Sequence, residues 1–230
     1  YNNPKFLGIC LKSFSNQTQP DFDIFIADDG SSPETKAKIQ SLGSLFSRPI
    51  QHYWHPDHGY RKAKINNEVF RALEKYEVVI LADADTIAHP KFIEDHLRMH
   101  ERSPRMLFMG RRVDLGPQIS SEFSEANVLQ FNRGLSKKLL QSWWRGETRN
   151  LGRAIRIENP VLQKIFRRDR VADLLGSNFS ISRELLWEVN GYDEEFASYW
   201  GEAGDLYVRV RNSGALIFGL KSYAVQYHLF

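Results

Sequence analysis

The sequence predicts an α/β protein whose mostly parallel sheet is covered by helices on both faces. Two apolar runs, at 23–27 and 77–82, have the composition of strands that are buried on both sides, as strands inside parallel sheets are. Strand-like and helix-like stretches also alternate along the chain, which is the pattern of such folds. With 230 residues, of which 42% are hydrophobic, the chain can bury one full core, so we expect a single domain.

Turn-forming residues divide the first half of the chain into elements. The polar residues at 30–32 follow the strand at 23–27, and Pro33 with Glu34 suits the start of a helix. Pro90 precedes another helix. We expect, in order, a helix at 5–17, a strand at 23–27, a helix at 33–46, a strand at 50–53, a helix at 62–76, a strand at 78–82, a helix at 91–101 and a strand at 106–111.

The second half of the chain is richer in helix, and no repeat or low-complexity segment divides it. We expect helices at 120–127, 132–145, 160–167, 183–189 and 205–212, and strands at 177–181, 216–219 and 224–228.

Composition excludes several functional classes. The formal net charge is only +3, which is too small to indicate nucleic-acid binding by the molecule as a whole. Cys10 is the only cysteine, so no internal disulfide can form, and its place on a helical apolar pattern makes it a core residue before a nucleophile. The sequence shows no run as long as a membrane span and no signal peptide, so we expect a cytoplasmic protein.

Asp83 and Asp85 are the most informative residues of the chain. They follow the apolar run at 77–82, and ligands of parallel sheets bind beyond the carboxyl ends of the strands. Alternating side chains place both carboxylates on one side of an extended backbone, where a divalent ion bridged to phosphate oxygens would use one or both as ligands. Taken alone, the Asp-x-Asp pattern is common, and an acidic turn after a strand explains it better.

A second acidic pair favours a ligand-binding site over an ordinary acidic turn. Asp28 and Asp29 follow the strand at 23–27, and a basic segment with Arg61 leads into the helix at 62–76. In this order the features describe a site for a nucleoside diphosphate. One carboxylate would take polar hydrogens of the base or ribose, Arg61 would face the base or a phosphate, and the later acidic pair would hold the metal.

Motifs spread along nearly the whole chain carry a family resemblance. They lie at 1–4, 28–32, 55–63, 83–85, 176–183, 189–196 and 200–202. In this order they resemble family 2 glycosyltransferases of the GT-A fold, and the C-terminal third is similar to the acceptor-side segment of β-galactosyltransferases and chondroitin-type polymerases. Each motif alone is common, whereas their joint occurrence is specific. Only the stretch at about 120–170 has no matching motif.

The resemblance implies a metal-dependent inverting glycosyltransferase with Mn²⁺ or Mg²⁺ as its cofactor. It would move a hexose or N-acetylhexosamine from a nucleotide sugar, expected to be a UDP sugar, to a glycan or lipid-linked acceptor hydroxyl, as in bacterial synthesis of surface polysaccharide or lipopolysaccharide. Residues at about 1–115 would bind the nucleotide sugar, and residues at about 116–230 would bind the acceptor. In this family an apolar strand precedes the Tyr-Asn pair, so the first strand is expected to be absent from this sequence.

The resemblance also implies roles for individual residues. The expected donor-binding residues are Tyr1, Asp28, Asp29, Arg61, Asp83 and Asp85, the acceptor-binding residues are Asn178, Trp200, Gly201 and Glu202, and the catalytic positions are Glu202, Ala203 and Asp205. The expected metal ligands are Asp85 and His228. Relatives have a histidine after the last strands, and an imidazole suits Mn²⁺. A packed core histidine is an equally good interpretation of His228.

The catalytic segment departs from the family at Ala203. In relatives a Glu-Asp pair follows Trp-Gly, and its Asp is held to be the general base, but a methyl group cannot accept a proton. Three interpretations remain open: an engineered inactive variant, a natural protein with reduced or lost activity, or an enzyme that uses Glu202 or Asp205 as the base. The first is favoured because every other element of the site is intact.

The segment at 133–170 is strongly basic. It has eleven Lys and Arg against three acids, an excess of eight positive charges, and it contains Trp143 and Trp144. One interpretation is a solvated helical face with two packed indoles. The other is a surface for an anionic acceptor or for anionic lipid headgroups, which would place the protein peripherally on the inner face of the membrane.

Two further functional classes remain as alternatives. A sugar nucleotidyltransferase would need a glycine-rich, basic phosphate loop near its start, which this chain lacks. A non-catalytic nucleotide-sugar or glycan-binding module gains weight from Ala203, and it would bind donor without turnover even after Asp is restored there.

Overall fold

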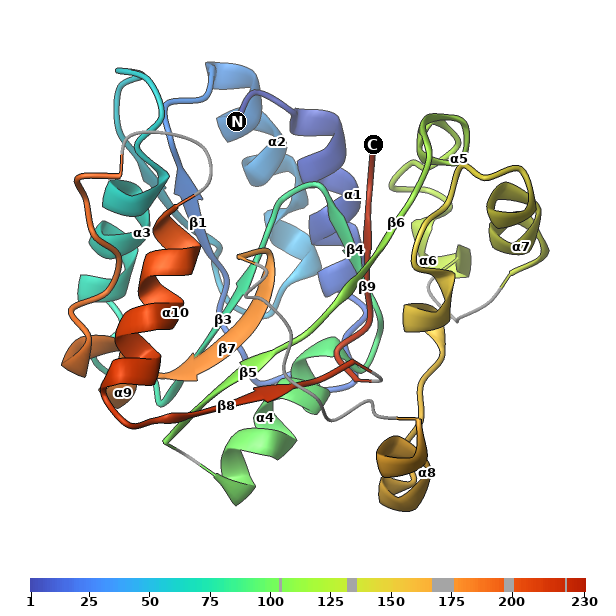
Figure 1. The fold of residues 1–230 in the computed structure, drawn as a ribbon. Helices are drawn as coiled ribbons and strands as arrows, with labels where there is room; N and C mark the ends of the chain where they lie inside the picture. The colour runs from blue at the N-terminus through green and yellow to red at the C-terminus, as the bar shows by residue number, and fades with distance from the viewer. Residues whose placement is uncertain (104, 132–135, 167–175, 197–200, 222) are drawn as a thin grey trace.

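Helices cover both faces of three small sheets in the part of the chain that the structure describes (Figure 1). The coordinates are a computed structural model, which describes residues 1–103, 105–131, 136–166, 176–196, 201–221 and 223–230. The first sheet joins β1 (Phe25–Asp28) to β2 (Gln51–Trp54). The second has the order β3 (Val78–Ala82), β7 (Asn178–Ser182), β5 (Met106–Met109) and β8 (Leu216–Gly219). The third has the order β4 (Thr86–Ala88), β9 (Gln226–His228) and β6 (Arg112–Asp114).

The α/β class is confirmed, but the prediction of a mostly parallel sheet is wrong. The pairs β1–β2, β5–β8 and β6–β9 are parallel, whereas β7 runs antiparallel to both β3 and β5, and β9 runs antiparallel to β4. Parallel neighbours require a crossover connection, usually a single helix. More than sixty residues, which include several helices, separate β6 from β7 in the sequence, so no short crossover sets the direction of this strand.

The helices have ends that the local sequence explains. They are α1 (Pro4–Phe14), α2 (Pro33–Leu42), α3 (Lys62–Arg71), α4 (Phe92–Arg102), α5 (Pro117–Ser121), α6 (Val128–Phe131), α7 (Lys137–Trp144), α8 (Pro160–Ile165), α9 (Arg183–Glu188) and α10 (Glu202–Asn212), with 3₁₀ turns at Gly43–Leu45 and Leu151–Ala154. At the start of α1, the Asn3 side chain accepts a hydrogen bond from the backbone N–H of Phe6, and Pro4 takes the first helical position. The Ser182 hydroxyl likewise caps α9, so β7 passes directly into that helix.

The core has a layer on each side of the sheets. Leu107 and Met109 of β5 pack with the apolar faces of α3, α9 and α10, whereas Phe108 between them packs with Phe92 of α4. Strand side chains alternate in direction, so a strand that is apolar at every position must be covered on both faces. The apolar run of β5 therefore explains why helices occupy both sides.

Most of the expected elements are present with shifted ends. The strands at 78–82 and 216–219 have the predicted bounds. α3 ends at Arg71, short of the expected 76, and a turn between α5 and α6 replaces most of the helix expected at 120–127. The three-residue strands β4 and β6 were not predicted. Parts of the helices expected at 132–145 and 160–167 fall outside the described residues.

A cavity of about 1550 Å³ separates β1 from β3. The consecutive residues 21–29 line one side and 75–85 the other, and side chains of α1 and α3 complete its walls. Among the described strands, β1 has a partner only on its β2 side and β3 only on its β7 side. Each strand therefore presents an unpaired edge to the cavity.

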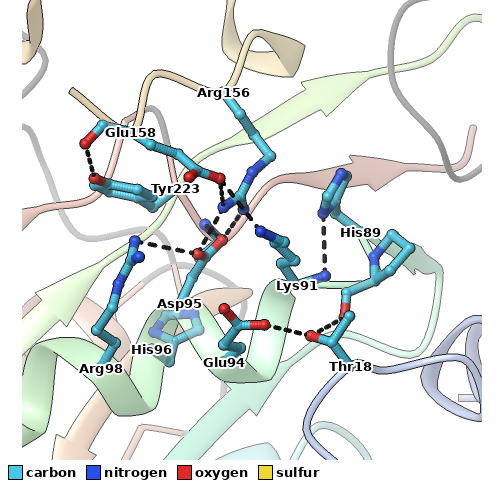
Figure 2. A network of polar contacts seen from close by, with 12 residues as sticks. Thr18, His89, Lys91, Glu94, Asp95, His96, Arg98, Arg156, Glu158 and Tyr223 are labelled. Atoms are coloured by element: carbon cyan, nitrogen blue, oxygen red, sulfur yellow. Dashed lines mark hydrogen bonds and ion pairs between the residues drawn. The ribbon is translucent and has the colours of Figure 1, made fainter.

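A buried ionic network attaches the segment before α8 to α4 (Figure 2). Asp95 of α4 is fully buried, and it accepts hydrogen bonds from both terminal nitrogens of the Arg156 guanidinium and from the backbone N–H of Ala224. Arg156 also pairs with Glu158 at 3.0 Å. Removing one partner of a buried pair leaves an uncompensated charge, so this network fixes the position of the segment.

Candidate active site

The two expected metal ligands lie side by side. The pairing of β4 with β9 places His228 opposite Thr86, and the Nε2 atom of His228 is 3.4 Å from Oδ2 of Asp85. The backbone N–H of Leu229 donates to the carbonyl of Asp85 at 2.8 Å, which holds the two segments together. Burial disfavours the charged carboxylate of Asp85, but the hydrogen bond and charge of His228 outweigh burial, so the pKa of Asp85 is lowered.

This pair fits a divalent cation. Oδ1 of Asp85 is buried and has no hydrogen-bond partner among the described residues, so it is available to a ligand. A carboxylate oxygen with an imidazole nitrogen is a donor set that suits Mn²⁺. No group of three or more His, Cys, Asp or Glu side chains in the described parts of the chain could hold a metal ion, and Asp85 with His228 supplies two such side chains.

Asp83, the other acid of this turn, faces a basic side chain. Lys62, the first residue of α3, places its Nζ atom 3.1 Å from Oδ1 of Asp83. Cys10 lies beneath the same turn, with its Sγ 3.7 Å from the carbonyl oxygen of Asp83. Burial raises the pKa of the Cys10 thiol to about 12, so it is a core residue, as the helical pattern predicted.

Each of the two acids at the carboxyl end of β1 is held by a histidine. His52 Nε2 lies 2.9 Å from Oδ2 of Asp28, and His55 Nε2 lies 2.5 Å from Oδ1 of Asp29. The second oxygen of Asp29 accepts the backbone N–H of Arg61 at 2.7 Å. Asp29 therefore positions the segment at 55–61, whereas Asp28 is tied to β2 through His52. The sequence analysis assigned no role to either histidine. Their positions, one within β2 and one directly after it, could have indicated that they lie beside the end of β1.

Tyr1 and Arg61 lie at the rim of this region. The hydroxyl of Tyr1 donates to Asp57, and the Arg61 guanidinium donates to the carbonyl of Pro56. Asn2 fixes the first residues by accepting from the backbone N–H of Ser32 at 2.8 Å. Most of the donor-binding residues expected from the sequence line the cavity, and Arg61 contacts one of them, Asp29. The lining residues are Tyr1, Asp28, Asp29, Asp83 and Asp85.

The first turn of α10 carries the expected catalytic positions. Glu202 is buried, and its Oε1 accepts a hydrogen bond of 2.8 Å from the Tyr60 hydroxyl. Ala203 packs against Gly176, which lines the cavity together with Asp83 and Asp85. Asp205 instead pairs with Arg209 one turn later, at 2.6 Å.

The expected acceptor residues are divided. Gly201 immediately precedes α10, whereas Trp200 lies outside the described residues. Asn178 is fully buried, and its amide donates to the carbonyl of Ala224 at 2.9 Å while its oxygen contacts His96 at 3.1 Å. Its side chain therefore belongs to the core rather than to a surface that meets a ligand.

Comparison with known families places most of the chain in one group. Residues 1–189 match the model of glycosyl transferase family 2, and residues 160–229 match that of the N-terminal domain of galactosyltransferase. Chondroitin synthase from Escherichia coli is 24% identical over 99% of this chain and 33% of its own length. Validoxylamine A glucosyltransferase from Streptomyces hygroscopicus subsp. jinggangensis is 23% identical over 93% of this chain and 50% of its own length. The chain thus spans a third to a half of these relatives.

Solved structures with similar folds include nucleotide complexes. TarS 1–349 of S. aureus, solved in complex with UDP-GlcNAc, has a TM-score of 0.63 and 13% identity over 96% of this chain and 54% of its own. GalNAc-T7, solved with UDP, GalNAc and Mn²⁺, has a TM-score of 0.63 and 13% identity over 96% of this chain and 40% of its own. At such low identity these likenesses establish the fold alone.

Proposed function

The chain belongs to glycosyl transferase family 2, and from this premise we propose that it transfers a sugar from a nucleoside diphosphate donor to an acceptor hydroxyl. The GT-A fold expected from its motifs is confirmed, and the chain is a glycosyltransferase. The observation that carries the proposal is a large cavity lined by Asp83, Asp85 and Tyr60. His228 contacts Asp85, and the buried carboxylate of Glu202 accepts a hydrogen bond from Tyr60. UDP is the proposed nucleotide, because similar folds were solved with UDP and with UDP-GlcNAc.

The donor is proposed to lie with its diphosphate at the Asp83–Asp85 turn. Asp28 and Asp29 face the base and ribose, and Arg61 provides a planar cation for the base or a phosphate. Lys62 adds a positive charge beside Asp83. Asp85 and His228 would hold Mn²⁺ or Mg²⁺. Such an ion, when bound, neutralises charge on the leaving diphosphate.

The proposed acceptor is a hydroxyl of a glycan or a lipid-linked sugar, in surface polysaccharide or lipopolysaccharide synthesis. Similarity to a chondroitin synthase supports a glycan, because that relative is named for making a polysaccharide. The acceptor oxygen attacks the anomeric carbon opposite the leaving diphosphate, which inverts that centre. In this arrangement, residues at about 1–115 supply the donor contacts and residues at about 116–230 supply the acceptor contacts.

Peripheral contact with an anionic membrane surface is the second part of this proposal. Trp144 of α7 is 86% exposed and Trp143 is 49% exposed, while Val161 and Ile165 of α8 are each 63% exposed. Aromatic and aliphatic side chains within a strongly basic segment are typical of surfaces that lie at lipid headgroups. None of the helices in the described ranges is long and apolar enough to cross a bilayer.

Calorimetry of UDP binding tests the donor site. We expect Mn²⁺ to tighten UDP binding by about tenfold or more, equivalent to roughly 1.4 kcal/mol, and Asp85→Ala to remove that gain. The matched control is Asp193→Ala, which removes an exposed carboxylate elsewhere. Equal affinities with Mn²⁺ and with a chelator would refute the metal role. No UDP binding in either condition would refute the nucleotide donor.

Liposome sedimentation tests the membrane surface. Binding to vesicles with anionic lipid should exceed binding to neutral vesicles and should fall as salt rises, because exposed charges are screened within about 10 Å at 0.1 M ionic strength. Replacing Trp143 and Trp144 with Ser should weaken it. Indifference to anionic lipid would make this segment an ordinary solvated face.

A further inference from the structure

The transfer reaction needs a proton acceptor beside the acceptor hydroxyl, and the first turn of α10 has three candidate positions. The assignment of that atom rests on the proposed function. Ala203 cannot serve, because a methyl group takes no proton. The Asp205 carboxylate is already neutralised by Arg209, which contacts it through two guanidinium nitrogens at 2.7 and 2.6 Å.

Glu202 is different from both neighbours. It is only 7% exposed, and the Tyr60 hydroxyl donates to its Oε1 at 2.8 Å. Its Oε2 is buried and has no hydrogen-bond partner among the described residues. A buried carboxylate oxygen without a partner is costly, and such an oxygen is satisfied when a ligand donates to it.

The surroundings of Glu202 keep it close to the donor carboxylates. Tyr60, which binds it, lines the same cavity as Asp83. The buried phenol of Tyr192 has a raised pKa, chiefly because of burial and then because of the negative charges of Glu202 and Asp83, so both carboxylates lie near this ring. Glu202 is also the first residue of an eleven-residue helix, where the helix dipole favours a negative charge.

We propose that Glu202 is the general base of this enzyme and that Oε2 is the atom that receives the proton. The acceptor oxygen forms its bond to the anomeric carbon as the bond from that carbon to the diphosphate oxygen breaks. The electron pair of the broken bond leaves with the diphosphate, and the acceptor proton passes to Oε2. Tyr60 is a positioning residue, because it acts only through Oε1. On this assignment, Ala203 does not make the chain inactive.

The test uses UDP release from UDP-GlcNAc in the presence of Mn²⁺, with a panel of p-nitrophenyl glycosides as acceptor probes. Glu202→Gln should lower kcat by about 10²–10⁴-fold, the usual contribution of a general base, while the Kd for UDP stays unchanged. Glu202→Asp should lose less activity, and formate should restore part of the rate to Glu202→Ala by supplying a carboxylate. Tyr60→Phe should cause a smaller loss in kcat.

Glu184→Gln is the matched control. Glu184 also lies in the first turn of a helix, α9, but it is exposed and should leave kcat unchanged. Thermal melting identifies any variant that fails to fold, and formate rescue separates a chemical role from a structural one.

Two outcomes would overturn the assignment. Full turnover by a folded Glu202→Gln protein would exclude Glu202. A gain of about 10²-fold or more in Ala203→Asp that persists when Glu202 is also changed to Gln would return the base to position 203. Absence of UDP release from every form, together with absence of UDP binding, would instead overturn the proposed function and with it the base.

Discussion

At the scale of single residues, a chain of side-chain hydrogen bonds crosses the core behind the candidate site. His100 contacts the Ser180 hydroxyl at 3.0 Å, that hydroxyl contacts Nδ1 of His96 at 2.8 Å, and Nε2 of His96 lies 3.1 Å from the Asn178 oxygen. The Asn178 oxygen can only accept, so we infer that neutral His96 donates from Nε2 and accepts at Nδ1. Burial lowers the pKa of His96 to about 3, which keeps it in this neutral form.

The buried, neutral His96 in this chain of hydrogen bonds predicts a loss of stability in acid. The folded pKa of His96 lies below its ordinary value of 6.5, so its contribution is complete above about pH 6.5 and is lost as pH falls toward 3. The loss is on the order of 5 kcal/mol at most. His89, whose pKa is lowered to about 4 by burial and by the charges of Arg156 and Lys91, adds to the same trend.

Denaturant unfolding between pH 7 and 4 checks this prediction. We expect His96→Gln to flatten the dependence of the unfolding free energy on pH, even if the variant is less stable at pH 7. The exposed His58, changed to Gln, should leave the slope as it is. An unchanged slope in His96→Gln would show that other groups cause the acid sensitivity.

The sequence did not predict the partners of the side chains that it assigned to the site. Asp85 and His228 lie together because β4, which begins just after Asp85, pairs with β9, which ends at His228. The contact between Tyr60 and Glu202 joins residues 142 positions apart, and no local pattern encodes it. Asn178 was assigned to the acceptor from a motif, but a motif does not reveal that the side-chain amide donates its hydrogen bonds to backbone carbonyls.

At the scale of elements, two strands next to the cavity have one partner each. Among the strands that the structure describes, β1 pairs only with β2 and β3 only with β7, whereas β5 and β7 have partners on both sides. Backbone amides without a ladder partner exchange more readily, because no internal hydrogen bond has to open. The structure therefore divides the strands into a protected group and a half-protected group.

Hydrogen exchange should reveal this division. We expect alternate amides of β1 and β3 to exchange at least about tenfold faster than those of β5 and β7 under native conditions. Residue-resolved NMR measures it, with β5 as the internal reference. Equal protection along all four strands would mean that the edges facing the cavity are covered in solution.

Elements with a strong apolar run were predicted well, and weak ones were not. β3 and β8 have the expected bounds because each is a continuous apolar stretch between polar turns. β4 and β6 contain only three residues each and have no periodicity of their own, so only their pairing with β9 creates them. The direction of β7 is likewise a property of the assembled sheet.

At the scale of the whole molecule, the two expected functional parts are interleaved. The order β3–β7–β5–β8 alternates strands from the first part, 1–115, with strands from the second, 116–230. Sequence order suggested a division into donor and acceptor segments, but that division does not describe two separable bodies. Strand pairing across it builds two shared sheets, β3–β7–β5–β8 and β4–β9–β6.

A fragment of residues 1–115 should therefore fail to fold. β5 would lose both of its neighbours and β3 its only described neighbour, leaving long apolar strands exposed. Circular dichroism should show no cooperative thermal transition for the fragment, whereas the 230-residue chain should melt in one step. A cooperative melt of the fragment would mean that the first part forms an independent unit.

The bond between Tyr60 and Glu202 has a kinetic consequence. The segment at 55–61 touches Asp29 on the donor side through Arg61, and it touches the proposed base through Tyr60. A bound nucleotide that orders this segment would also order Glu202, so the acceptor should add second and the nucleotide should leave last. UDP as a product inhibitor would then compete with the nucleotide sugar and be non-competitive against the acceptor. This pattern identifies a compulsory order of substrate binding, which here would depend on the segment at 55–61.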